Sequence, residues 1–473
     1  MIYWDEQTEV VVIGSGLAGL AAAIEARKAG ASVIVFEKMP LTGGNTRISD
    51  GGLAAPGNYL QKRRGIPDSP ALFYEDMAKA GLGLNHPELL KIVAEQASAA
   101  IDWTRSELGV EYLDRLDRFG GHSAARSLTT RSHSGVDIIK AQQACLRRLG
   151  GEIRTRCLLT ALIQDGSGAV CGVEIQAGYK FAQDDSGSKI HVRATRGVVL
   201  ASGGFGSDIG FRSLQNPRLD ESVGSTNHRG ATSEGLVAAL KIGAAPVHLS
   251  WIQTGPWACA DESGYGKGAR FASYSVFPGG ILVDPATGRR IVNEWADRRQ
   301  RSDAIFRAGH ACVGIVDTEG AKLARQSLEH CLKSGKVKGF DNLADLAVAY
   351  GMASEHLTAT VDDYNRRICK GQPDPFGKPL SQEVRLLSRP PFYAVRLWPK
   401  VHYTPGGIGI NSEARVIDLA NRPIPGLFAA GEVCGGIHGA SRLGSCALTE
   451  CLVFGRIAGR QAALLGARKN RFG

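Results

Sequence analysis

Apolar residues near the start of the chain change from a strand-like to a helix-like spacing and back. Residues 9–13 form a β-branched apolar run, which is typical of a buried parallel strand. Residues 20–27 then place apolar side chains at helical spacing, and residues 32–36 form a second apolar run that Glu37 follows. This pattern predicts a strand, a helix and a second strand, which together form a βαβ unit.

Three glycines join the first strand to the helix in G-x-G-x-x-G spacing, at Gly14, Gly16 and Gly19. In such a turn the first glycine permits a tight bend, the second lets backbone N–H groups approach a pyrophosphate, and the third lets the helix pack on the strand. The helix N-terminus adds partial positive charge at the phosphates, and Glu37 is placed to accept hydrogen bonds from ribose hydroxyls. The pattern predicts a dinucleotide site. The alternative is a tight βα turn without a ligand.

The chain from residue 60 to residue 206 continues this mixture of elements. Apolar residues recur at helical spacing in three segments, 69–80, 87–107 and 135–149. Strand-like runs follow at 152–163, 169–176 and 189–201. The last run leads into a glycine turn, which repeats the strand-and-turn pattern of the N-terminal unit.

Residues 250–402 differ in character from the segments on either side. They hold several tryptophans, a basic cluster from Arg298 to Arg301, and polar helices expected near 318–333 and 342–370. The chain then returns to strand and glycine character. We therefore predict an α/β fold in which residues 1–249 and 403–473 form a Rossmann-like domain and residues 250–402 form an inserted α+β capping domain.

A second glycine-rich stretch lies near the end of the chain, from Leu427 to Gly444. It predicts a strand, a glycine turn and Arg442, placed beside whatever the N-terminal dinucleotide carries. Together the two stretches suggest a two-ended flavin site with a cationic substrate anchor. No second complete G-x-G-x-x-G occurs, so a separate nicotinamide site is not indicated.

Length and cysteine usage limit the classes of protein that the chain can belong to. At 473 residues it is too long for one hydrophobic core, and no apolar run approaches membrane-spanning length. Its start lacks the basic-then-apolar pattern of a secretory signal. The ten cysteines are scattered, without CxxC or CxxCH, which argues against a zinc ribbon, an iron–sulfur cluster or attached c-type haem. We expect a cytoplasmic protein of two or more domains without a metal site.

The net charge is +10, yet no basic run with interleaved aromatics and no nucleic-acid motif is present. Nucleic acid is therefore not an expected partner. A positive field that attracts carboxylate substrates or an acidic redox partner fits the charge better. A solvated basic surface with no particular partner explains it equally well.

A series of motifs resembles the fumarate reductase and succinate dehydrogenase flavoprotein superfamily. Within it, the chain is most similar to soluble flavocytochrome c-type fumarate reductases and their urocanate- and acrylate-reducing relatives. The likeness covers nearly the whole chain. Its motifs, in family order, are Gly14–Gly19, Glu37–Pro40 with Gly43–Thr46, Val199–Gly204, Gly230–Gly235, Val292–Glu294, His402–Gly407, Ala430–Val433 and His438–Gly444.

The resemblance implies FAD, with its adenine half on the N-terminal βαβ unit and its isoalloxazine ring beside the capping domain. Some members attach FAD covalently through a histidine in the loop that matches residues 43–52. This loop has no histidine and Asn45 stands at the matching place, so we expect non-covalent FAD. The cofactor-binding residues that the resemblance implies are Gly14, Gly16, Gly19, Glu37, Lys38, Gly43, Gly44, Asn45, Thr46, Gly51, Gly52, Gly203, Gly431, Glu432, Ser445, Ala447 and Leu448.

The resemblance also implies an oxidoreductase that reduces, or forms, a C=C bond next to a carboxylate by hydride transfer at flavin N5. Arg442, which can hold a carboxylate bidentately, and His402 would grip the substrate, and Arg298 would deliver the proton. Without the resemblance, Arg299 and Arg301 are equal rivals of Arg298. Further expected substrate-binding residues are Gln253, Gly255, Trp257 and Tyr403. The partners implied are a small unsaturated carboxylate and an external electron donor or acceptor, such as another redox protein.

Departures from the family pattern bear on the substrate. Gly255 stands where fumarate reductases have the histidine of Gln-x-His-Pro, and we expect it to leave room between Trp251 and Trp257 for a larger or less charged group. The acidic and basic residues of the family's proton relay are replaced by Ser273 and Val276. Tyr265 or Tyr274 could take part in a new relay, and His248 or Arg270 could supply the missing anchor. A substrate other than fumarate is expected.

Two alternatives remain open. One is a ketosteroid dehydrogenase-like or amino-acid oxidase-like flavoenzyme, and the other is a non-catalytic redox flavoprotein subunit. Neither a steroid site nor an electron carrier needs the anion-binding set of His402, Arg298 and Arg442, which disfavours both.

Overall fold

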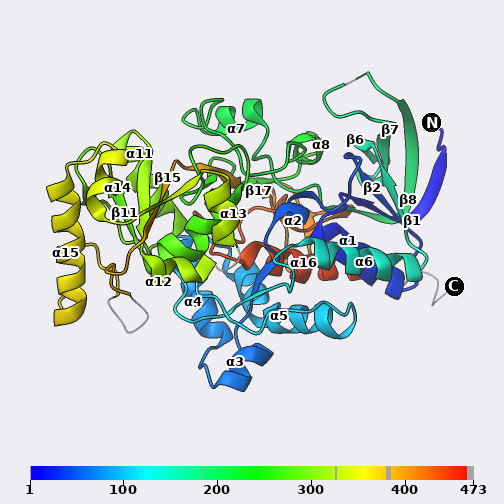
Figure 1. Cartoon of the computed structure of the whole chain (residues 1–473). Helices are drawn as coiled ribbons and strands as arrows, with labels where there is room; N and C mark the ends of the chain where they lie inside the picture. The colour runs from blue at the N-terminus through cyan, green and yellow to red at the C-terminus, as the bar shows by residue number, and fades with distance from the viewer. Residues whose placement is uncertain (1, 184, 325–326, 380–384, 466–473) are drawn as a thin grey trace.

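The computed structural model describes residues 2–183, 185–324, 327–379 and 385–465 (Figure 1). Within them, eight strands form one mixed sheet in the order β18-β19-β8-β1-β2-β5, and β7 joins β6 to β8. The strands of the sheet are β1 (Glu6–Ile13), β2 (Val33–Glu37), β5 (Glu152–Thr155), β6 (Cys157–Gln164), β7 (Val170–Ala177), β8 (Ser188–Leu200), β18 (Arg415–Ile417) and β19 (Pro423–Ala429). Because β1, β2, β8 and β19 run parallel, the sheet unites the two ends of the sequence.

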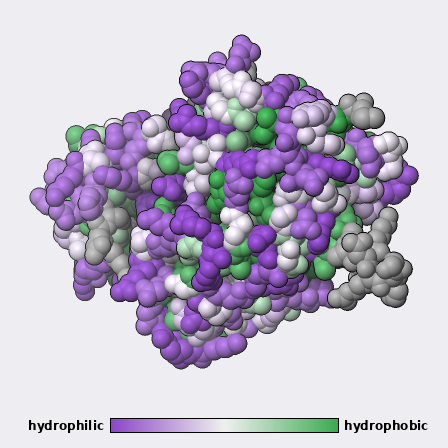
Figure 2. All heavy atoms as spheres, turned by 90° about the vertical axis from the view of Figure 1, so that its right-hand side faces the viewer, coloured by the Kyte–Doolittle hydropathy of each residue, from purple (hydrophilic) through white to green (hydrophobic). Residues whose placement is uncertain are grey.

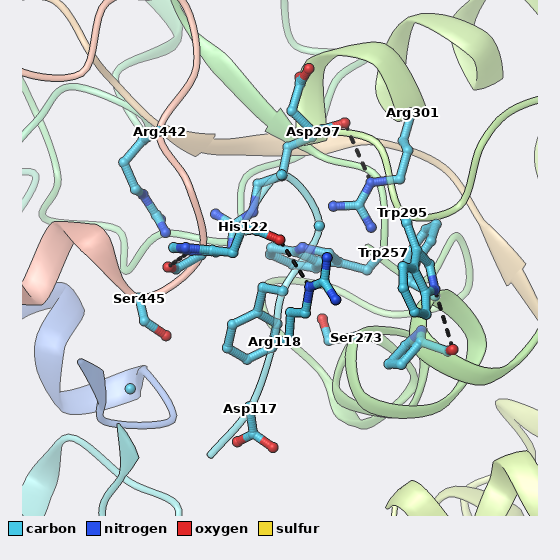
Figure 3. A pocket seen from close by; sticks show the side chains of 18 of the residues that line it. Asp117, Arg118, His122, Trp257, Ser273, Trp295, Asp297, Arg301, Arg442 and Ser445 are labelled. Atoms are coloured by element: carbon cyan, nitrogen blue, oxygen red, sulfur yellow. Dashed lines mark hydrogen bonds between the residues drawn. The ribbon is translucent and has the colours of Figure 1, made fainter. Parts of the chain in front are cut away.

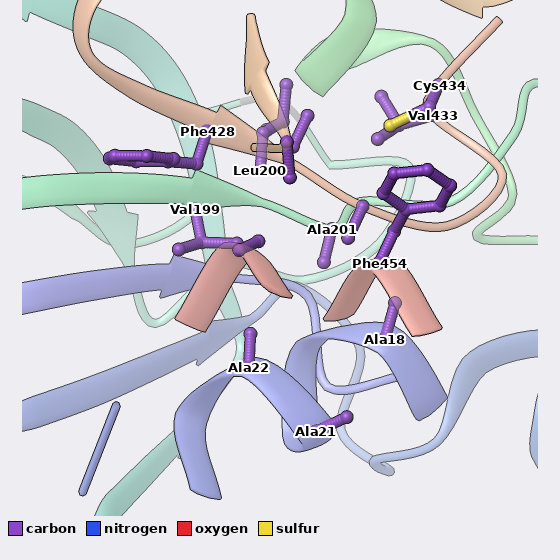
Figure 4. Close-up of a cluster of buried hydrophobic side chains, with 14 of the residues drawn as sticks. Ala18, Ala21, Ala22, Val199, Leu200, Ala201, Phe428, Val433, Cys434 and Phe454 are labelled. Carbon is purple, nitrogen blue, oxygen red and sulfur yellow. The ribbon is translucent and has the colours of Figure 1, made fainter. Parts of the chain in front are cut away.

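Two helices pack closely on each other beneath this sheet, α1 (Leu17–Lys28) and α16 (Cys446–Leu464) (Figures 1 and 4). A Cβ on Gly455 would lie 2.5 Å from the Ala18 carbonyl oxygen, and one on Gly459 would lie 2.0 Å from that of Ala22. Only glycine therefore allows this close helix contact. Through this contact α16, which follows the second glycine-rich stretch, packs against α1, the helix that follows the N-terminal glycine turn.

Further helices surround this layer. The longer ones are α3 (Tyr59–Arg64), α4 (Pro70–Ala80), α5 (Pro87–Ser106), α6 (Val136–Arg148), α7 (Ile209–Gln215) and α8 (Glu234–Lys241). The expected helices at 69–80, 87–107 and 135–149 therefore agree with α4, α5 and α6. The expected strand at 152–163 is divided into β5 and β6, because Arg156 between them has a left-handed φ of 60°.

A second sheet lies in the middle of the sequence. Its five strands, in the same described part of the chain, follow the order β12-β11-β13-β15-β14 and pair antiparallel. They are β11 (Ile281–Asp284), β12 (Arg289–Arg290), β13 (Cys312–Val316), β14 (Val337–Phe340) and β15 (Phe392–Leu397). The helices around it are α9 (Lys267–Phe271), η1 (Ala272–Val276), α10 (Phe277–Gly279), α11 (Arg298–Ala308), α12 (Thr318–Ala321), η2 (Lys322–Ala324), α13 (Ser327–Lys333), α14 (Leu343–Ala349) and α15 (Ser354–Lys370).

Two helix predictions in this part need correction. The segment 342–370 is not one helix: Gly351, with φ of +70°, ends α14, and its N–H bonds back to the Val348 carbonyl before α15 begins. The segment 318–333 is also divided, into α12, η2 and α13, and residues 325–326 lie outside the described residues. Sequence periodicity alone did not indicate either break.

The chain enters and leaves the middle segment through two paired strands. β10 (Gln253–Gly255) runs antiparallel to β16 (Lys400–Tyr403), and Gln253 pairs with Tyr403. Shorter elements elsewhere are α2 (Gly44–Ile48), β3 (Gly52–Ala54), β4 (Ser127–Thr129), β9 (Pro246–Val247) and β17 (Gly407–Ile408). The predicted domain borders, after residues 249 and 402, stay a prediction, but they fall beside this strand pair.

The face of the molecule beside the large sheet is mainly hydrophilic, with smaller hydrophobic areas near its middle (Figure 2). A search of the described residues finds no helix with the length and apolar character needed to span a bilayer. All ten cysteines lie in the described part of the chain as free thiols.

Candidate active site

The N-terminal glycine turn has the geometry that its spacing predicts. Gly14 has φ of +100°, and a Cβ there would lie 2.3 Å from the Ala201 carbonyl oxygen. A Cβ on Gly19 would lie 2.0 Å from the Gly14 carbonyl oxygen, so this glycine brings α1 against β1. Gly16 has no atom within 4 Å of such a Cβ, so its backbone is accessible to a ligand.

A small cavity opens at this turn. Glu37 lies at its wall, where its carboxylate accepts hydrogen bonds from the N–H (3.0 Å) and hydroxyl (2.6 Å) of Ser15 and from the N–H of Met39. Lys38 bonds to Glu234 at 2.8 Å and to Thr232. The expected cofactor residues that line this cavity are Gly14, Gly16, Glu37, Lys38, Gly44, Asn45, Thr46, Gly203, Gly431 and Glu432.

A larger cleft of about 1280 Å³ continues from the small cavity. Asn45, Thr46, Glu432 and Cys451 line both, so the two form one elongated space. Among the expected cofactor residues, Gly52, Ser445, Ala447 and Leu448 line the cleft. Three expected residues line neither space: Gly19, Gly43 and Gly51.

These three glycines serve the local backbone instead. Gly43 precedes α2 with φ of +106° and donates its N–H to the Ser15 hydroxyl. Gly51 has φ of +70°, and a Cβ there would lie 2.5 Å from the Thr130 hydroxyl oxygen. Gly19 packs α1 on the turn, as expected from its place in the motif. A role for Gly43 and Gly51 in cofactor contact is therefore replaced by a role in shaping the loop.

Arg442 and His402 both line the cleft, and Figure 3 shows Arg442 there. Arg442 Nη2 donates to His402 Nε2 at 3.0 Å, and His402 Nδ1 lies 2.7 Å from the Thr226 hydroxyl. Because Nε2 accepts, the ring carries its proton on Nδ1. Burial and the charges of Arg298 and Arg442 lower the pKa of His402 well below its usual value, so the imidazole is neutral.

Arg442 itself is incompletely bonded. It is 6% exposed, and its Nη1 donates to the Leu443 carbonyl at 3.1 Å, while its Nε has no partner. No acidic side chain among the described residues forms an ion pair with it. Its guanidinium lies 4.8 Å from the Tyr403 ring centre. A buried cation with unused donors is a site for an anion.

Arg298, at the start of α11, faces the same cleft. Its Nη1 lies 3.5 Å from Gln253 Oε1, and Gln253 in turn donates to the Ser441 hydroxyl and the Arg442 carbonyl at 2.9 Å. Burial and the charges of Arg442 and Arg301 lower the pKa of Arg298 well below its usual value. Gln253 therefore connects the two arginines without lining the cleft.

The neighbouring arginines have other partners. Arg301 is buried over the Phe277 ring and donates to the carbonyls of Asp297 and Glu294 at 3.4 Å. Arg299 also lines the cleft but pairs with Asp303 at 3.5 Å, and both side chains are partly exposed. Of the three rivals, Arg298 is the one that faces Arg442 through Gln253.

The expected space beside Gly255 does not exist. A Cβ on Gly255 would lie 2.8 Å from the Trp257 indole, because the outer atoms of the indole's benzene ring lie against the glycine. Neither Gly255 nor Trp251 lines the cleft, whereas Trp257 does and packs edge-on to His402, with ring centres 4.6 Å apart. The prediction of a binding role for Gly255 is therefore wrong: the glycine admits an aromatic wall and leaves no room.

A carboxylate that the sequence patterns did not indicate lies in the cleft. Asp50 accepts a hydrogen bond of 2.5 Å from the Tyr274 hydroxyl, and both line the cleft with Tyr265 and Ser273. Val276, the other residue at a family relay position, is fully buried in the core. The alternative anchors lie elsewhere: His248 packs on His86, and Arg270 donates to the His133 carbonyl at 3.3 Å.

His122 and Phe119 were also missed, because the segment from residue 110 to 130 has no periodic pattern. His122 is buried in the cleft wall, and its Nε2 donates to the Gly444 carbonyl at 2.9 Å. Arg126 donates to its Nδ1 at 3.2 Å and holds that tautomer. The Gly-Gly-His sequence at 120–122 could have pointed to His122, and Asp50 lies within the glycine-rich loop 43–52.

The profile of the family described as FAD binding domain matches residues 9–448. The chain belongs to this family. The elongated space fits that cofactor, since it begins at the open backbone of Gly16 beside Glu37 and ends at Arg442 and the start of α16. The protein is thus an FAD-dependent oxidoreductase, and the prediction of FAD is confirmed.

Similar proteins agree with the fold and the enzyme class. The chain is 42% identical to the acrylate reductase flavoprotein subunit of Shewanella woodyi, over 97% of this chain and 92% of that protein. It is 34% identical to the urocanate reductase of Eggerthella lenta, over 97% and 75%. The open conformation of a flavocytochrome c3 fumarate reductase superposes with a TM-score of 0.76 at 33% identity, over 97% and 78%. The predicted fumarate reductase-like class and the predicted fold are confirmed.

Proposed function

We propose that the protein reduces the C=C bond of an unsaturated monocarboxylate in preference to the dicarboxylate fumarate. The observation that carries this proposal is the unpaired guanidinium of Arg442, buried beside a neutral His402 and facing Arg298. Three relatives with names that specify acrylate, urocanate or fumarate support the substrate class.

A planar carboxylate matches the donors that Arg442 leaves free. Two parallel N–H groups can bind its two oxygens, and none of the acidic side chains that the structure describes forms an ion pair with this guanidinium. The incoming negative charge also favours protonation of His402, which can then donate from Nε2. Substrate binding should therefore be coupled to uptake of a proton.

The chemistry needs a hydride on one alkene carbon and a proton on its neighbour. Bound FAD in its reduced form supplies the hydride. The guanidinium of Arg298 holds the proton, and the lowered pKa of this group makes it a stronger acid than an arginine in water. Arg442 and His402 fix the carboxylate, so that charge developing next to it in the transition state is stabilised.

The far end of the cleft favours an apolar or aromatic group over a second carboxylate. Trp257 and Tyr265 beside His402, and Tyr274 and Phe119 beside each other, give the cleft aromatic walls. Asp50 adds a negative charge, which disfavours a dianionic substrate. A steroid-like substrate would leave Arg442 without its anion.

A substrate panel tests the proposal. Under anaerobic conditions, with reduced viologen as external donor, reoxidation should be fast with cinnamate, urocanate or methacrylate. If no unsaturated carboxylate reoxidises the donor, the proposal fails. Acid precipitation should release the FAD, since no histidine lies in loop 43–52 to tether it, and flavin left on the polypeptide would contradict non-covalent binding.

A further inference from the structure

We propose that Asp50 and Tyr274 form a proton relay that restores the proton of Arg298 after each turnover. This inference rests on the proposed reductase activity, because a proton donor must be recharged once per double bond reduced. This relay would take the place of the family's acidic and basic relay residues, at whose positions this chain has Ser273 and Val276.

Tyr274 reaches Asp50 from an unusual backbone. It lies in the π-helical turn η1 (Ala272–Val276), between α9 and α10. Such turns are rare and recur at functional sites, because the wider turn redirects a side chain. Here the Tyr274 hydroxyl meets Asp50 Oδ2 at 2.5 Å, while Asp50 Oδ1 accepts the Gly52 N–H at 3.2 Å. The second bond fixes the carboxylate on the loop that lines the cofactor space.

Asp50 is also electrostatically linked to Arg298. No described acidic residue forms an ion pair with Arg298, and the negative charge of Asp50 favours its protonated form. Both Asp50 and Arg298 line the same cleft. A proton on Asp50 therefore has a favourable destination whenever Arg298 has become neutral.

The hydrogen-bonded pair of Asp50 and Tyr274 lies near a partly buried ion pair. Asp117 contacts Arg115 at 3.2 Å, with side chains 18% and 12% exposed, and Asp117 also lines the cleft (Figure 3). The Arg115 guanidinium lies 5.4 Å from the Tyr274 ring centre, and His133 packs against the same ring at 6.2 Å. Burial and the charges of Asp50, Tyr265 and Asp117 raise the pKa of Tyr274 well above its usual value. The hydroxyl thus stays protonated at rest.

The proton count of the relay is balanced. Arg298 gives its proton to the substrate carbon next to the one that takes the hydride. The O–H bond of Tyr274 breaks as its proton moves to Asp50, and the proton on Asp50 passes through cleft water to form an N–H bond on Arg298. Solvent near Asp117 returns a proton to Tyr274. One solvent proton is consumed for each double bond reduced.

Tyr265 is the rival relay residue, and its contacts differ. Its ring packs on Trp257 at 5.1 Å and on His402 at 6.5 Å, and its hydroxyl bonds to Ser273. No carboxylate of the described residues is bonded to it. Tyr265 therefore lacks the acceptor that Asp50 gives to Tyr274.

Two near-isosteric variants test the relay, Tyr274→Phe and Asp50→Asn, with their double variant. Phenylalanine keeps the ring contacts, and asparagine keeps an oxygen for the Gly52 N–H. Tyr265→Phe tests the rival. Tyr112→Phe is a matched control, because this buried tyrosine bonds to Thr104 at 2.7 Å outside the cleft. Equal FAD absorbance per chain should show that all variants are folded and loaded.

In each relay variant, kcat should fall by about 100-fold with the solvent isotope effect on kcat increased. The double variant should fall no further than the worse single one, because the pair acts as a unit. The dissociation constant of a saturated product carboxylate, followed by flavin absorbance without turnover, should stay within about twofold of wild type, since substrate contacts are kept. The loss should deepen as pH rises and solvent protons become scarce.

Three outcomes would overturn the relay: wild-type kcat in both variants, the same loss in Tyr265→Phe alone, or weakened product binding with an unchanged isotope effect. The last would make Asp50 a substrate contact. If wild-type protein reduces no unsaturated carboxylate, the proposed function fails instead, and this result is separate because it appears before any variant is made.

Discussion

Two buried arginines, Arg126 and Arg442, show how differently one side chain is used in this protein. Arg126 is fully buried and bonds to both Asp68 oxygens at 2.8 Å and to Asp76 at 2.6 Å. Arg442 is nearly as buried, but its partners are a carbonyl and a neutral imidazole. The first charge is neutralised by the chain, whereas the second lacks a counter-charge.

The difference separates stability from function. A paired buried arginine stabilises the fold only as long as both partners remain, because either one alone is a desolvated charge. An unpaired one costs stability in the free protein and gains its partner when an anionic ligand arrives. Arg290, which pairs with Glu294 and Asp374 in the middle sheet, belongs to the first kind, and Arg298 belongs to the second.

The largest expected effect concerns the paired arginine. Arg126→Met should destabilise the holoprotein by about 3–5 kcal/mol, because it leaves Asp68 and Asp76 buried without their cation. Thermal and denaturant unfolding would measure this. Arg442→Met is the matched control and should unfold at or above the wild-type temperature. A larger loss in Arg442→Met than in Arg126→Met would break the comparison.

The unpaired arginine should matter for turnover. Arg442→Lys keeps the charge but loses the parallel N–H pair, so kcat/KM should fall by an amount equivalent to about 2–5 kcal/mol, with FAD content unchanged. Steady-state kinetics on the best substrate of the panel would measure it. Near-normal kcat/KM in Arg442→Lys would show that the carboxylate is not held bidentately.

The preference of the Arg442 site for a monocarboxylate can be tested by the choice of substrate. A monocarboxylate with an aromatic or apolar group should exceed fumarate by about tenfold in kcat/KM, which needs only about 1.4 kcal/mol of differential binding. Asp50 and the aromatic walls are the reason. Side-by-side kinetics on fumarate, cinnamate, urocanate and methacrylate would decide it, and fumarate as the best of the four would refute the assignment of the far end.

A pH-dependent effect is expected at His122, which accepts a hydrogen bond from Arg126 and donates one to the Gly444 carbonyl. Burial and the charge of Arg126 lower its pKa from 6.5 to about 4. Below its unfolded pKa the unfolded chain binds a proton that the folded chain does not, so this contribution to stability is present above pH 6.5 and is lost as pH falls towards about 4. A shift from 6.5 to about 4 corresponds to roughly 3 kcal/mol at about 1.4 kcal/mol per pKa unit, so His122→Gln should remove a pH dependence of that order, measured as unfolding free energy at both pH values. An unchanged pH slope would contradict it.

The sequence predicted the cofactor half of the site better than the substrate half. Gly14, Gly16 and Glu37 act through backbone geometry that their spacing defines, so position along the chain was enough. The grouping of His402 with Arg442 followed from the family motifs, and the structure places both in one cleft.

The substrate half depends on packing between distant segments. The filling of the space beside Gly255 by Trp257 is a tertiary contact that the missing side chain could not reveal. The bond between Asp50 and Tyr274 joins residues 224 positions apart and depends on a π-helical turn that no apolar period indicates. Such contacts arise from how the segments fold together.

The pairing of β10 with β16 has a consequence for how this protein can change. Because the chain leaves the large sheet and returns to it through adjacent strands, with Gln253 beside Tyr403, the residues between them form a cassette with neighbouring ends. A related cassette of different length could be exchanged at this joint without altering the path of the remaining chain. Arg298, Trp257, Tyr265 and Tyr274 would leave with it, while Arg442, Asp50, Phe119 and the cofactor turn would stay. Engineering of a new acceptor specificity can therefore begin at one splice point.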